Sequence, residues 1–384
     1  MVKKFQARNV MNFKNTITID FSNTAGYHFN SDCLTNQLIS KMVIYGRNAT
    51  GKTNLGAVLF DIKKNLLGTR FYGTDKGIFL NADSDELYAE FVYEFQFGAE
   101  EVTYRYHRSD ELSLVDEELL LNNTSCFYCN FITKEFHFPN LHLLDAETAV
   151  VERFLQSLNA PDEDNPTSTR TPPFLRWLIN NTALSPNATL LQLSRFVSHM
   201  SAMSANTSII ALPGRILQNF IDTLENEDEL RRFEEFLNIM GIECQLVCAR
   251  TPDGRVELYF RHEKLVPFFE TASSGTISIF NFYRRLKQNT NPSLIYLDEF
   301  DAFYHYEMSD NVIHFLKKMF PMCQVILTTH NTNLLTNRFW RPDCVFILSR
   351  AGQLTALCDA TPRELREGHN LEKMYISGEF DRYE

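Results

Sequence analysis

Short apolar runs rich in β-branched and aromatic residues recur along the chain, and each ends in polar or glycine positions. Such runs are typical of strands that are buried on both faces of a parallel sheet. They occupy residues 42–45, 294–297, 325–327 and 345–348. Stretches with helical character lie between them, for example at 53–67 and 311–319. Because strand and helix alternate, the pattern predicts an α/β fold with a mostly parallel core sheet covered by helices.

A different pattern, with apolar side chains at every second position, indicates a second kind of sheet. It runs through residues 87–97 and returns at 102–106. This alternation predicts a half-buried antiparallel hairpin that turns at Gly98. Residues 5–21 and 255–260 also have strand character. Together these segments predict an antiparallel β layer beside the parallel core.

The middle of the chain has helical spacing of apolar residues, interrupted by an acidic, proline-bearing loop at 160–173. The expected helices cover residues 146–158, 173–179, 190–203 and 212–240. We interpret residues 123–241 as a compact, mainly helical insertion between an N-terminal lobe, 1–122, and a C-terminal lobe, 242–384.

The composition is that of a folded protein. The 384 residues suffice for one large α/β domain or two ordinary ones, and 44% of them are hydrophobic and 22% charged. The net charge of -11 should repel nucleic-acid backbones, so contact with DNA would need a local basic patch. We see no signal peptide and no apolar stretch long enough for a membrane span, and the eight cysteines are scattered. We therefore expect a cytoplasmic protein with reduced thiols and no membrane contact.

One motif lies between the first apolar run and the helix that follows it, and it fits the pattern G-x-x-x-x-G-K-S/T. Backbone N–H groups of such a loop close around phosphate oxygens, and the helix dipole favours the same negative charge. Lys52 would add its charge at the outer phosphates, and Thr53 would offer its hydroxyl to Mg²⁺. We therefore predict a nucleoside triphosphate and Mg²⁺ as ligands, which the resemblance given below narrows to ATP; the alternative is a chance glycine turn before a helix. The predicted ATP-binding residues are Gly46, Arg47, Asn48, Ala49, Thr50, Gly51, Lys52, Thr53 and Asn54.

Two further strands end in residues suited to phosphate chemistry. The run at 294–297 is followed by Asp298, which could hold Mg²⁺ together with Thr53, and by Glu299, which could polarise an attacking water. The run at 325–327 leads to His330, a possible donor to the γ-phosphate and sensor of its presence. We predict Glu299, His330 and Lys52 as catalytic residues. The alternatives are a solvated acidic turn that includes Asp301, and a structural histidine.

A small-residue turn at 272–276 opens the helix expected to run through Leu286. Ser273, Ser274 and Gly275 would present hydroxyl and N–H groups at its N-terminus, which makes a second possible anion site. The alternative is a plain helix cap.

Along the chain the elements follow as the loop at 46–53, the small-residue turn at 272–276, the acids at 298–299, and His330. These four elements, in this order, resemble the ATP-binding-cassette superfamily. The resemblance implies that Ser273, Ser274 and Gly275 contact the γ-phosphate held by a second subunit, so that a homodimer or higher oligomer encloses ATP. The wide spacing between Lys52 and Ser273 is similar to that of RecF-like and SMC-like heads, which carry an insertion.

Some features look more closely like stand-alone ATPases of the overcoming-lysogeny-defect type. They are Asn12-Phe13 near the start, the tyrosine-rich hairpin, the run 298–301 with His305, and the ending at 366–378. That resemblance implies a role in anti-phage defence, as in the ATPase subunits of PARIS and abortive-infection systems. Only 54 residues follow His330 (384 minus 330), too few for a Toprim nuclease module. We therefore expect a nuclease or toxin effector to be a separate, nearby-encoded protein.

We considered two other functions. One is a RecF-like DNA-binding repair ATPase, and the other is a nucleotide-binding scaffold without turnover. The basic clusters that could touch DNA are Lys3-Lys4 with Arg8, Arg231-Arg232, and Arg284-Arg285 with Lys287. Neighbouring acids favour the view that these clusters are solvated faces. A zinc site at Cys126 and Cys129 is also disfavoured, because His137 and His142 do not supply a convincing second pair of ligands.

Overall fold

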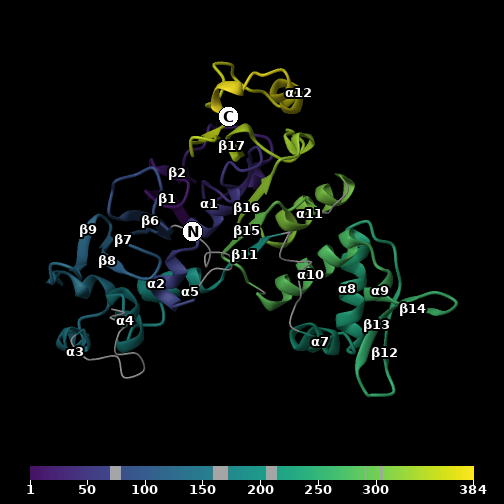
Figure 1. Cartoon of the computed structure of the whole chain (residues 1–384), viewed down its shortest axis with the longest axis horizontal. Coiled ribbons are helices and arrows are strands. Elements are labelled where there is room, and N and C mark those ends of the chain that lie inside the picture. The colour runs from purple at the N-terminus through teal and green to yellow at the C-terminus, as the bar shows by residue number, and fades with distance from the viewer. Residues whose placement is uncertain (70–78, 159–171, 205–213, 290, 303–305) are drawn as a thin grey trace.

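The computed structural model describes residues 1–69, 79–158, 172–204, 214–289, 291–302 and 306–384. Within these residues the chain builds two large sheets and a smaller lobe (Figure 1). The expected α/β class, with a mostly parallel sheet, an antiparallel sheet and covering helices, is confirmed.

The core sheet has the strand order β11-β15-β16-β5-β17-β18. Its members are β5 (Lys41–Tyr45), β11 (Met200–Ser204), β15 (Leu294–Asp298), β16 (Gln324–Thr329), β17 (Val345–Leu348) and β18 (Leu354–Ala356). The first five strands in this order pair in parallel, and β18 is antiparallel to β17. Every residue of β5, β15, β16 and β17 is buried. The four predicted core strands are thus confirmed.

The register of the core sheet brings three strand ends to one edge. Thr329 pairs with Tyr45, and Leu297 pairs with Leu327. The loop after β5, the acids at the end of β15 and the residue after β16 therefore lie side by side. Helices α1 (Lys52–Leu59) and α2 (Ile62–Leu67) follow β5, and α11 (Tyr306–Met319) connects β15 to β16.

The antiparallel sheet has the order β10-β9-β8-β7-β6-β1-β2. Its strands are β1 (Val2–Arg8), β2 (Ile17–Asp20), β6 (Ala89–Phe97), β7 (Glu100–Arg108), β8 (Leu114–Leu121), β9 (Thr124–Asn130) and β10 (Glu135–His137). The predicted hairpin is confirmed as β6 and β7, with Gly98 in the left-handed region at φ 61°. Leu87 was expected on the inward face, and this was wrong: β6 begins only at Ala89, and Leu87 is 71% exposed.

The lobe on the right of Figure 1 contains a three-stranded sheet of β12 (Leu246–Arg250), β13 (Val256–Arg261) and β14 (Leu265–Pro267). The expectation that residues 255–260 join the antiparallel layer was therefore wrong, because β13 pairs with β12 and β14 instead. Helices α7 (Gly214–Thr223), α8 (Glu227–Ile239), α9 (Phe268–Thr271) and α10 (Ser274–Gln288) belong to the same part of the chain.

The helices expected in the middle of the chain form with changed ends. They are α3 (Val151–Ser157), α4 (Phe174–Asn181), α5 (Thr189–Ser198), and the pair α7 and α8. Residues 200–203, expected as the end of a helix, form β11 instead. Backbone pairing with the edge of β15 outweighs the helical spacing there. Because β9, β10 and β11 also fall within 123–241, that stretch is more mixed than the pattern suggests; the division into three domains stays a prediction.

The predicted helix at 53–67 is interrupted between α1 and α2, and the predicted strand at 5–21 is divided into β1 and β2. Most of the loop expected at 160–173 lies outside the described residues, as does His305. The remaining short elements are β3 (Leu34–Thr35), β4 (Leu38–Ile39), α12 (Leu371–Ile376), and 3-10 turns at Ser31–Cys33, Leu141–Leu144, Thr332–Leu334, Pro342–Cys344 and Asp381–Tyr383. In the part of the chain that the structure describes, no helix has the length and apolarity needed to cross a bilayer.

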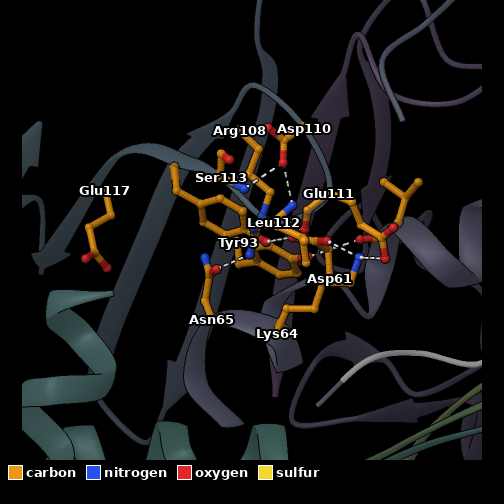
Figure 2. Close-up of polar contacts among 12 residues, drawn as sticks. Asp61, Lys64, Asn65, Tyr93, Arg108, Asp110, Glu111, Leu112, Ser113 and Glu117 are labelled. Carbon is orange, nitrogen blue, oxygen red and sulfur yellow. Dashed lines mark hydrogen bonds and ion pairs between the residues drawn. The ribbon is translucent and has the colours of Figure 1, made fainter. Parts of the chain in front are cut away.

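A buried polar network joins the turn between α1 and α2 to the antiparallel sheet (Figure 2). Asp61 accepts hydrogen bonds from the Tyr106 hydroxyl at 2.8 Å and from the Arg108 Nε at 2.9 Å. Arg108 also donates to Asn65, whose amide donates to the Tyr104 hydroxyl at 3.2 Å. These bonds hold Asp61 against the sheet at the point where the helix is interrupted.

Candidate nucleotide-binding site

The loop after β5 has the backbone geometry that its two glycines allow. Gly51 has φ +100°, and a Cβ there would collide with the amide of Asn12. At Gly46 a Cβ would lie 2.7 Å from Thr50 Oγ1. Ala49 is also in the left-handed region, at φ 65°. Residues 47–49 are exposed. The loop is therefore a tight turn with an open outer surface, and α1 begins at Lys52 directly after it.

The Lys52 ammonium lies over this loop. Its Nζ donates to the carbonyls of Gly46 at 2.7 Å and Arg47 at 3.1 Å, and the side chain is buried. Burial lowers the pKa of Lys52, and the nearby charge of Glu299, followed by those of Asp298 and Asp301, acts in the opposite direction. Because its hydrogen bonds are to neutral carbonyls, the ammonium has charge available for an anion at the loop.

Asp298 joins the end of β15 to the first turn of α1. Its Oδ2 accepts from the Thr53 hydroxyl at 2.6 Å, and its Oδ1 accepts from the Thr328 hydroxyl at 2.8 Å. Burial raises the pKa of Asp298, and hydrogen bonds from the two threonines lower it. A carboxylate and a hydroxyl that meet in this way are the oxygen donors that Mg²⁺ prefers. Thr53 and Asp298 therefore fit the metal site predicted from the sequence.

Glu299 follows Asp298 in a strained conformation. Its φ is 47°, which is unusual for a residue with a side chain, and its N–H donates to Thr328 Oγ1 at 2.8 Å. The Glu299 side chain is half-buried, whereas Asp298 and Asp301 are buried. Asp301 accepts from the Thr329 hydroxyl at 2.9 Å. A solvated acidic turn, the alternative considered above, does not describe this arrangement.

His330 comes directly after β16 and is exposed. The residue before it, Thr329, accepts the Gly46 N–H at 3.3 Å through its backbone carbonyl. The structure thus places His330 next to the loop that carries Lys52. Its part in chemistry stays a prediction.

Ser273, Ser274 and Gly275 lie at the N-terminus of α10. The Ser273 hydroxyl accepts the Thr276 N–H at 3.1 Å and shares a 2.9 Å hydrogen bond with the Thr276 hydroxyl. Ser273 and Ser274 are exposed, and Gly275 is buried. Among the described residues, no hydrogen bond or ion pair joins Ser273 or Ser274 to the loop at 46–53. The cap that the sequence allowed is present, and a role in anion binding stays a prediction.

Several residues near the loop were not singled out for the site from the sequence. Asn12 donates to the Thr50 carbonyl at 3.3 Å and accepts from Asn54 at 2.8 Å. The Tyr296 hydroxyl donates to the Lys52 carbonyl at 2.5 Å, and its ring packs on Gly56. Asn12 could have been found from the sequence, because Asn12-Phe13 is among the features noted above as resembling a family of ATPases. Tyr296 could not have been found in this way, because an aromatic residue in an apolar strand is expected to pack in the core.

The C-terminal segment also reaches the loop. Arg47 forms an ion pair with Glu384, and the Tyr45 and Tyr375 rings lie 4.6 Å apart between centroids. The Arg47 side chain remains 57% exposed. An arginine of the predicted phosphate loop is thus paired with a carboxylate more than 300 residues away, which no local pattern could have indicated.

The cysteine pair lies in the hydrophobic core. Cys126 and Cys129 are both buried on β9. Burial raises the pKa of Cys126 to about 11 and raises that of Cys129 further. Thiols held in the neutral form are poor zinc ligands. The described residues contain no cluster of three or more His, Cys, Asp or Glu side chains placed to hold a metal ion.

Comparison with known proteins identifies the family. Residues 41–336 match the family described as "AAA domain, putative AbiEii toxin, Type IV TA system", and the chain belongs to it. The matched residues include the loop, the acids and His330. No curated protein matches the sequence.

The chain is also similar to solved SMC heads. An SMC head bound to the C-winged helix domain of ScpA has 14% identity and a TM-score of 0.47, covering 92% of this chain and 96% of that one. The SMC head domain from Thermotoga maritima has 14% identity and a TM-score of 0.43, with coverage of 92% and 98%. The SMC head from Pyrococcus furiosus, which has an extended coiled coil and is bound to the C-terminal domain of ScpA, has 12% identity and a TM-score of 0.43, with coverage of 99% of both chains.

By family, the chain is an AAA-type ATPase. Its own topology is a mostly parallel sheet, with the glycine-bearing loop after β5, and an antiparallel sheet beside it. The expected fold class is confirmed.

Proposed function

We propose that this protein binds ATP with Mg²⁺ at the loop 46–53 and hydrolyses it. The observation that carries the proposal is the convergence of Lys52, Thr53 and Asp298 at one edge of the core sheet, with the 2.6 Å bond between Thr53 and Asp298. When bound, Mg²⁺ supplies a Lewis acid at the phosphate oxygens. Lys52 supplies positive charge next to carbonyls that cannot neutralise it. The residues of the loop thus suit a triphosphate.

Glu299 is the proposed general base. It lies one residue beyond the proposed metal ligand and is only half-buried, so its carboxylate can reach water. His330 is the proposed donor at the γ-phosphate, because its strand ends beside Gly46. Together these residues can orient the substrate, take a proton from the attacking water and stabilise developing charge.

We further propose that a second copy of the chain completes the site. Ser273 and Ser274 are exposed at the N-terminus of α10, where hydroxyl and N–H groups can meet an anion. A homodimer, or a higher oligomer built in the same way, would enclose ATP between Lys52 of one copy and Ser273 of the other. ATP binding would then favour the assembled state, and hydrolysis would release it.

The family name supports a role in phage defence. The description names a putative AbiEii toxin and a type IV TA system. We propose that the ATP-dependent assembly controls an effector protein, a nuclease or a toxin, in an anti-phage system within the cytoplasm.

The DNA-binding alternative receives less support from the surface. Lys3 pairs with Glu101 at 2.6 Å, and Arg8 lies 3.3 Å from both Glu86 and Glu90. On α8 the acids at 228 and 229 pair with Arg231 and Arg232. Much of the positive charge of these two clusters is therefore offset by nearby acids, on other segments of the chain for Lys3 and Arg8 and on the same helix for Arg231 and Arg232.

The proposal is tested by phosphate release from ATP in the presence of Mg²⁺. The parent protein should release phosphate, and Lys52→Ala should release none above background. Turnover that is absent from the parent protein, or unchanged in Lys52→Ala, contradicts the proposal. Light scattering of Glu299→Gln with ATP tests the assembly: an increase in mass is expected, and an unchanged mass contradicts it.

A further inference from the structure

Thr328, the second-last residue of β16, contacts Asp298, the last residue of β15, and Glu299, the residue after it. Thr328 is fully buried. Its hydroxyl donates to Asp298 Oδ1 at 2.8 Å and accepts the Glu299 N–H at 2.8 Å. Its backbone carbonyl accepts the Phe300 N–H at 3.3 Å. One side chain therefore fixes a carboxylate and the peptide group that follows it.

The peptide held by Thr328 belongs to a residue in an unfavourable conformation. Glu299 has φ 47°, a left-handed value that residues with a Cβ adopt only when their surroundings hold them there. The hydrogen bond from the Glu299 N–H to Thr328 is such a restraint. The backbone conformation of Glu299 in turn sets the direction in which its carboxylate leaves the sheet edge.

Thr329 extends the same arrangement to the other elements of the site. Its hydroxyl donates to Asp301 at 2.9 Å and accepts the Asn331 N–H at 2.9 Å. Its carbonyl accepts the Gly46 N–H at 3.3 Å. The end of β16 thus links the acidic turn, the phosphate loop and the segment of His330.

We propose that Thr328 is a positioning residue for hydrolysis, which acts by holding Glu299 in its strained conformation and Asp298 in its orientation. The inference rests on the ATPase function proposed above. Among the described residues, no hydrogen bond joins the Thr328 side chain directly to the loop at 46–53; it reaches the loop only through Asp298. We therefore expect its loss to affect the chemical step more than substrate binding. Its hydroxyl is the essential group, because only an oxygen can both donate to Asp298 and accept from Glu299.

Thr328→Val removes the hydroxyl and keeps the shape of the side chain. We expect kcat to fall about 100-fold, the scale of a small misplacement of a catalytic group, and KM to change by less than about threefold. Thr328→Ser keeps the hydroxyl and should keep most of the parent kcat. Thr182→Val is the matched control: the Thr182 hydroxyl is buried and, in the described structure, has no hydrogen-bond partner. Its kcat should equal that of the parent.

The outcomes separate this inference from the proposed function. A parent protein without turnover contradicts the ATPase itself, as measured above with Lys52→Ala. If the parent turns over and Thr328→Val has the same kcat, the positioning role is overturned. It is also overturned if Thr328→Ser loses as much kcat as Thr328→Val, or if KM rises as much as kcat falls. If Thr328→Val melts below the assay temperature, Thr328→Ala replaces it in the test. A loss of kcat at constant KM in that variant supports the positioning role, and a kcat equal to that of the parent overturns it.

Discussion

The Thr53 hydroxyl donates a 2.6 Å hydrogen bond to Asp298, although 245 positions separate the two residues. Thr53 stands in the first turn of α1 and Asp298 at the end of β15. The bond exists because β5 and β15 flank β16 in a parallel register, so that their carboxyl ends meet at one edge. Two motifs that are far apart in sequence thus form one site.

The carboxylate at this site should cost stability. Burial raises the pKa of Asp298, which means that the fold disfavours its ionised form. Asp298→Asn should therefore abolish Mg²⁺-dependent turnover and, without ligands at pH 7, raise the melting temperature by a few degrees. Calorimetry with a turnover assay checks both parts. A lower melting temperature would contradict this account of the site.

Asp110 offers the opposite case on the same protein. Although burial acts to raise its pKa, hydrogen bonds that include those from the N–H groups of Leu112, at 2.7 Å, and Ser113, at 2.8 Å, lower it overall (Figure 2). The fold therefore favours the ionised form, and Asp110→Asn should lower the melting temperature at pH 7 without loss of turnover. A higher melting temperature for Asp110→Asn would contradict the view that the lowered pKa of Asp110 reflects a stabilising contribution of its carboxylate.

The ion pair between Asp61 and Arg108 should be essential for stability. Both side chains are 4% exposed, and they are 2.9 Å apart. Arg108→Met removes the closer of the two cations paired with the buried Asp61 carboxylate and leaves only Lys64, at 3.4 Å, so the free energy of unfolding should fall by about 3 kcal/mol.

The matched control for this variant is Arg105→Met on the same strand. Arg105 pairs with Glu118, and its side chain is 51% exposed, so the change should cost less than about 1 kcal/mol. Denaturant unfolding measures both variants. Equal losses for the two would contradict the importance of the buried pair.

Glu117 should make stability depend on pH. It is fully buried on β8, accepts from the Tyr104 hydroxyl at 2.8 Å and from the Phe174 N–H, and burial raises its pKa from 4.5 to about 7. Since the folded state binds this proton more tightly, its contribution is complete below pH 4.5 and is lost as the pH rises to about 7. The shift corresponds to roughly 3 kcal/mol.

Glu117→Gln removes this ionisation. The free energy of unfolding of the parent, measured by urea between pH 5 and pH 8, should decline relative to that of the variant as the pH rises. Parallel curves for the two proteins across this range would rule out the role of Glu117.

The contact between Arg47 and Glu384 should tune nucleotide affinity. A carboxylate paired with the phosphate loop neutralises a charge that would otherwise attract a triphosphate. Glu384→Gln should therefore tighten ATP binding a few-fold, with little change in stability because Arg47 is largely exposed.

Glu379→Gln is the control for this prediction. Glu379 lies in the same segment but accepts from the Thr361 hydroxyl at 2.8 Å instead of pairing with the loop. Its substitution should leave ATP affinity unchanged. Weaker binding by Glu384→Gln, measured by titration with a fluorescent ATP analogue, would contradict this account of Arg47.

Much of the core could be predicted because it depends on local patterns. Fully buried strands need continuous apolar runs, and β5, β15, β16 and β17 have them. The hairpin could be predicted because one face of β6 and β7 is buried and alternates strictly. By contrast, β11 has helix-compatible residues and becomes a strand only because the edge of β15 is free to pair with it.

The parts of the site that could be predicted are those formed by a few consecutive residues, such as the loop with Lys52 and the acids at Asp298. The site was not predictable where a role comes from pairing across the fold. The two hydrogen bonds of the Thr328 hydroxyl, for example, require β15 and β16 to be neighbours. Glu384 and Tyr296 depend in the same way on tertiary contacts that leave no trace in local sequence.

Calorimetric titration with a non-hydrolysable ATP analogue and Mg²⁺ tests the central claim most directly, because it asks only whether the converged residues bind the triphosphate. The parent protein should bind with an affinity that depends on Mg²⁺, and Lys52→Ala should bind at least about tenfold more weakly, the equivalent of about 1.4 kcal/mol. No binding by the parent, or equal binding by Lys52→Ala, would contradict the account.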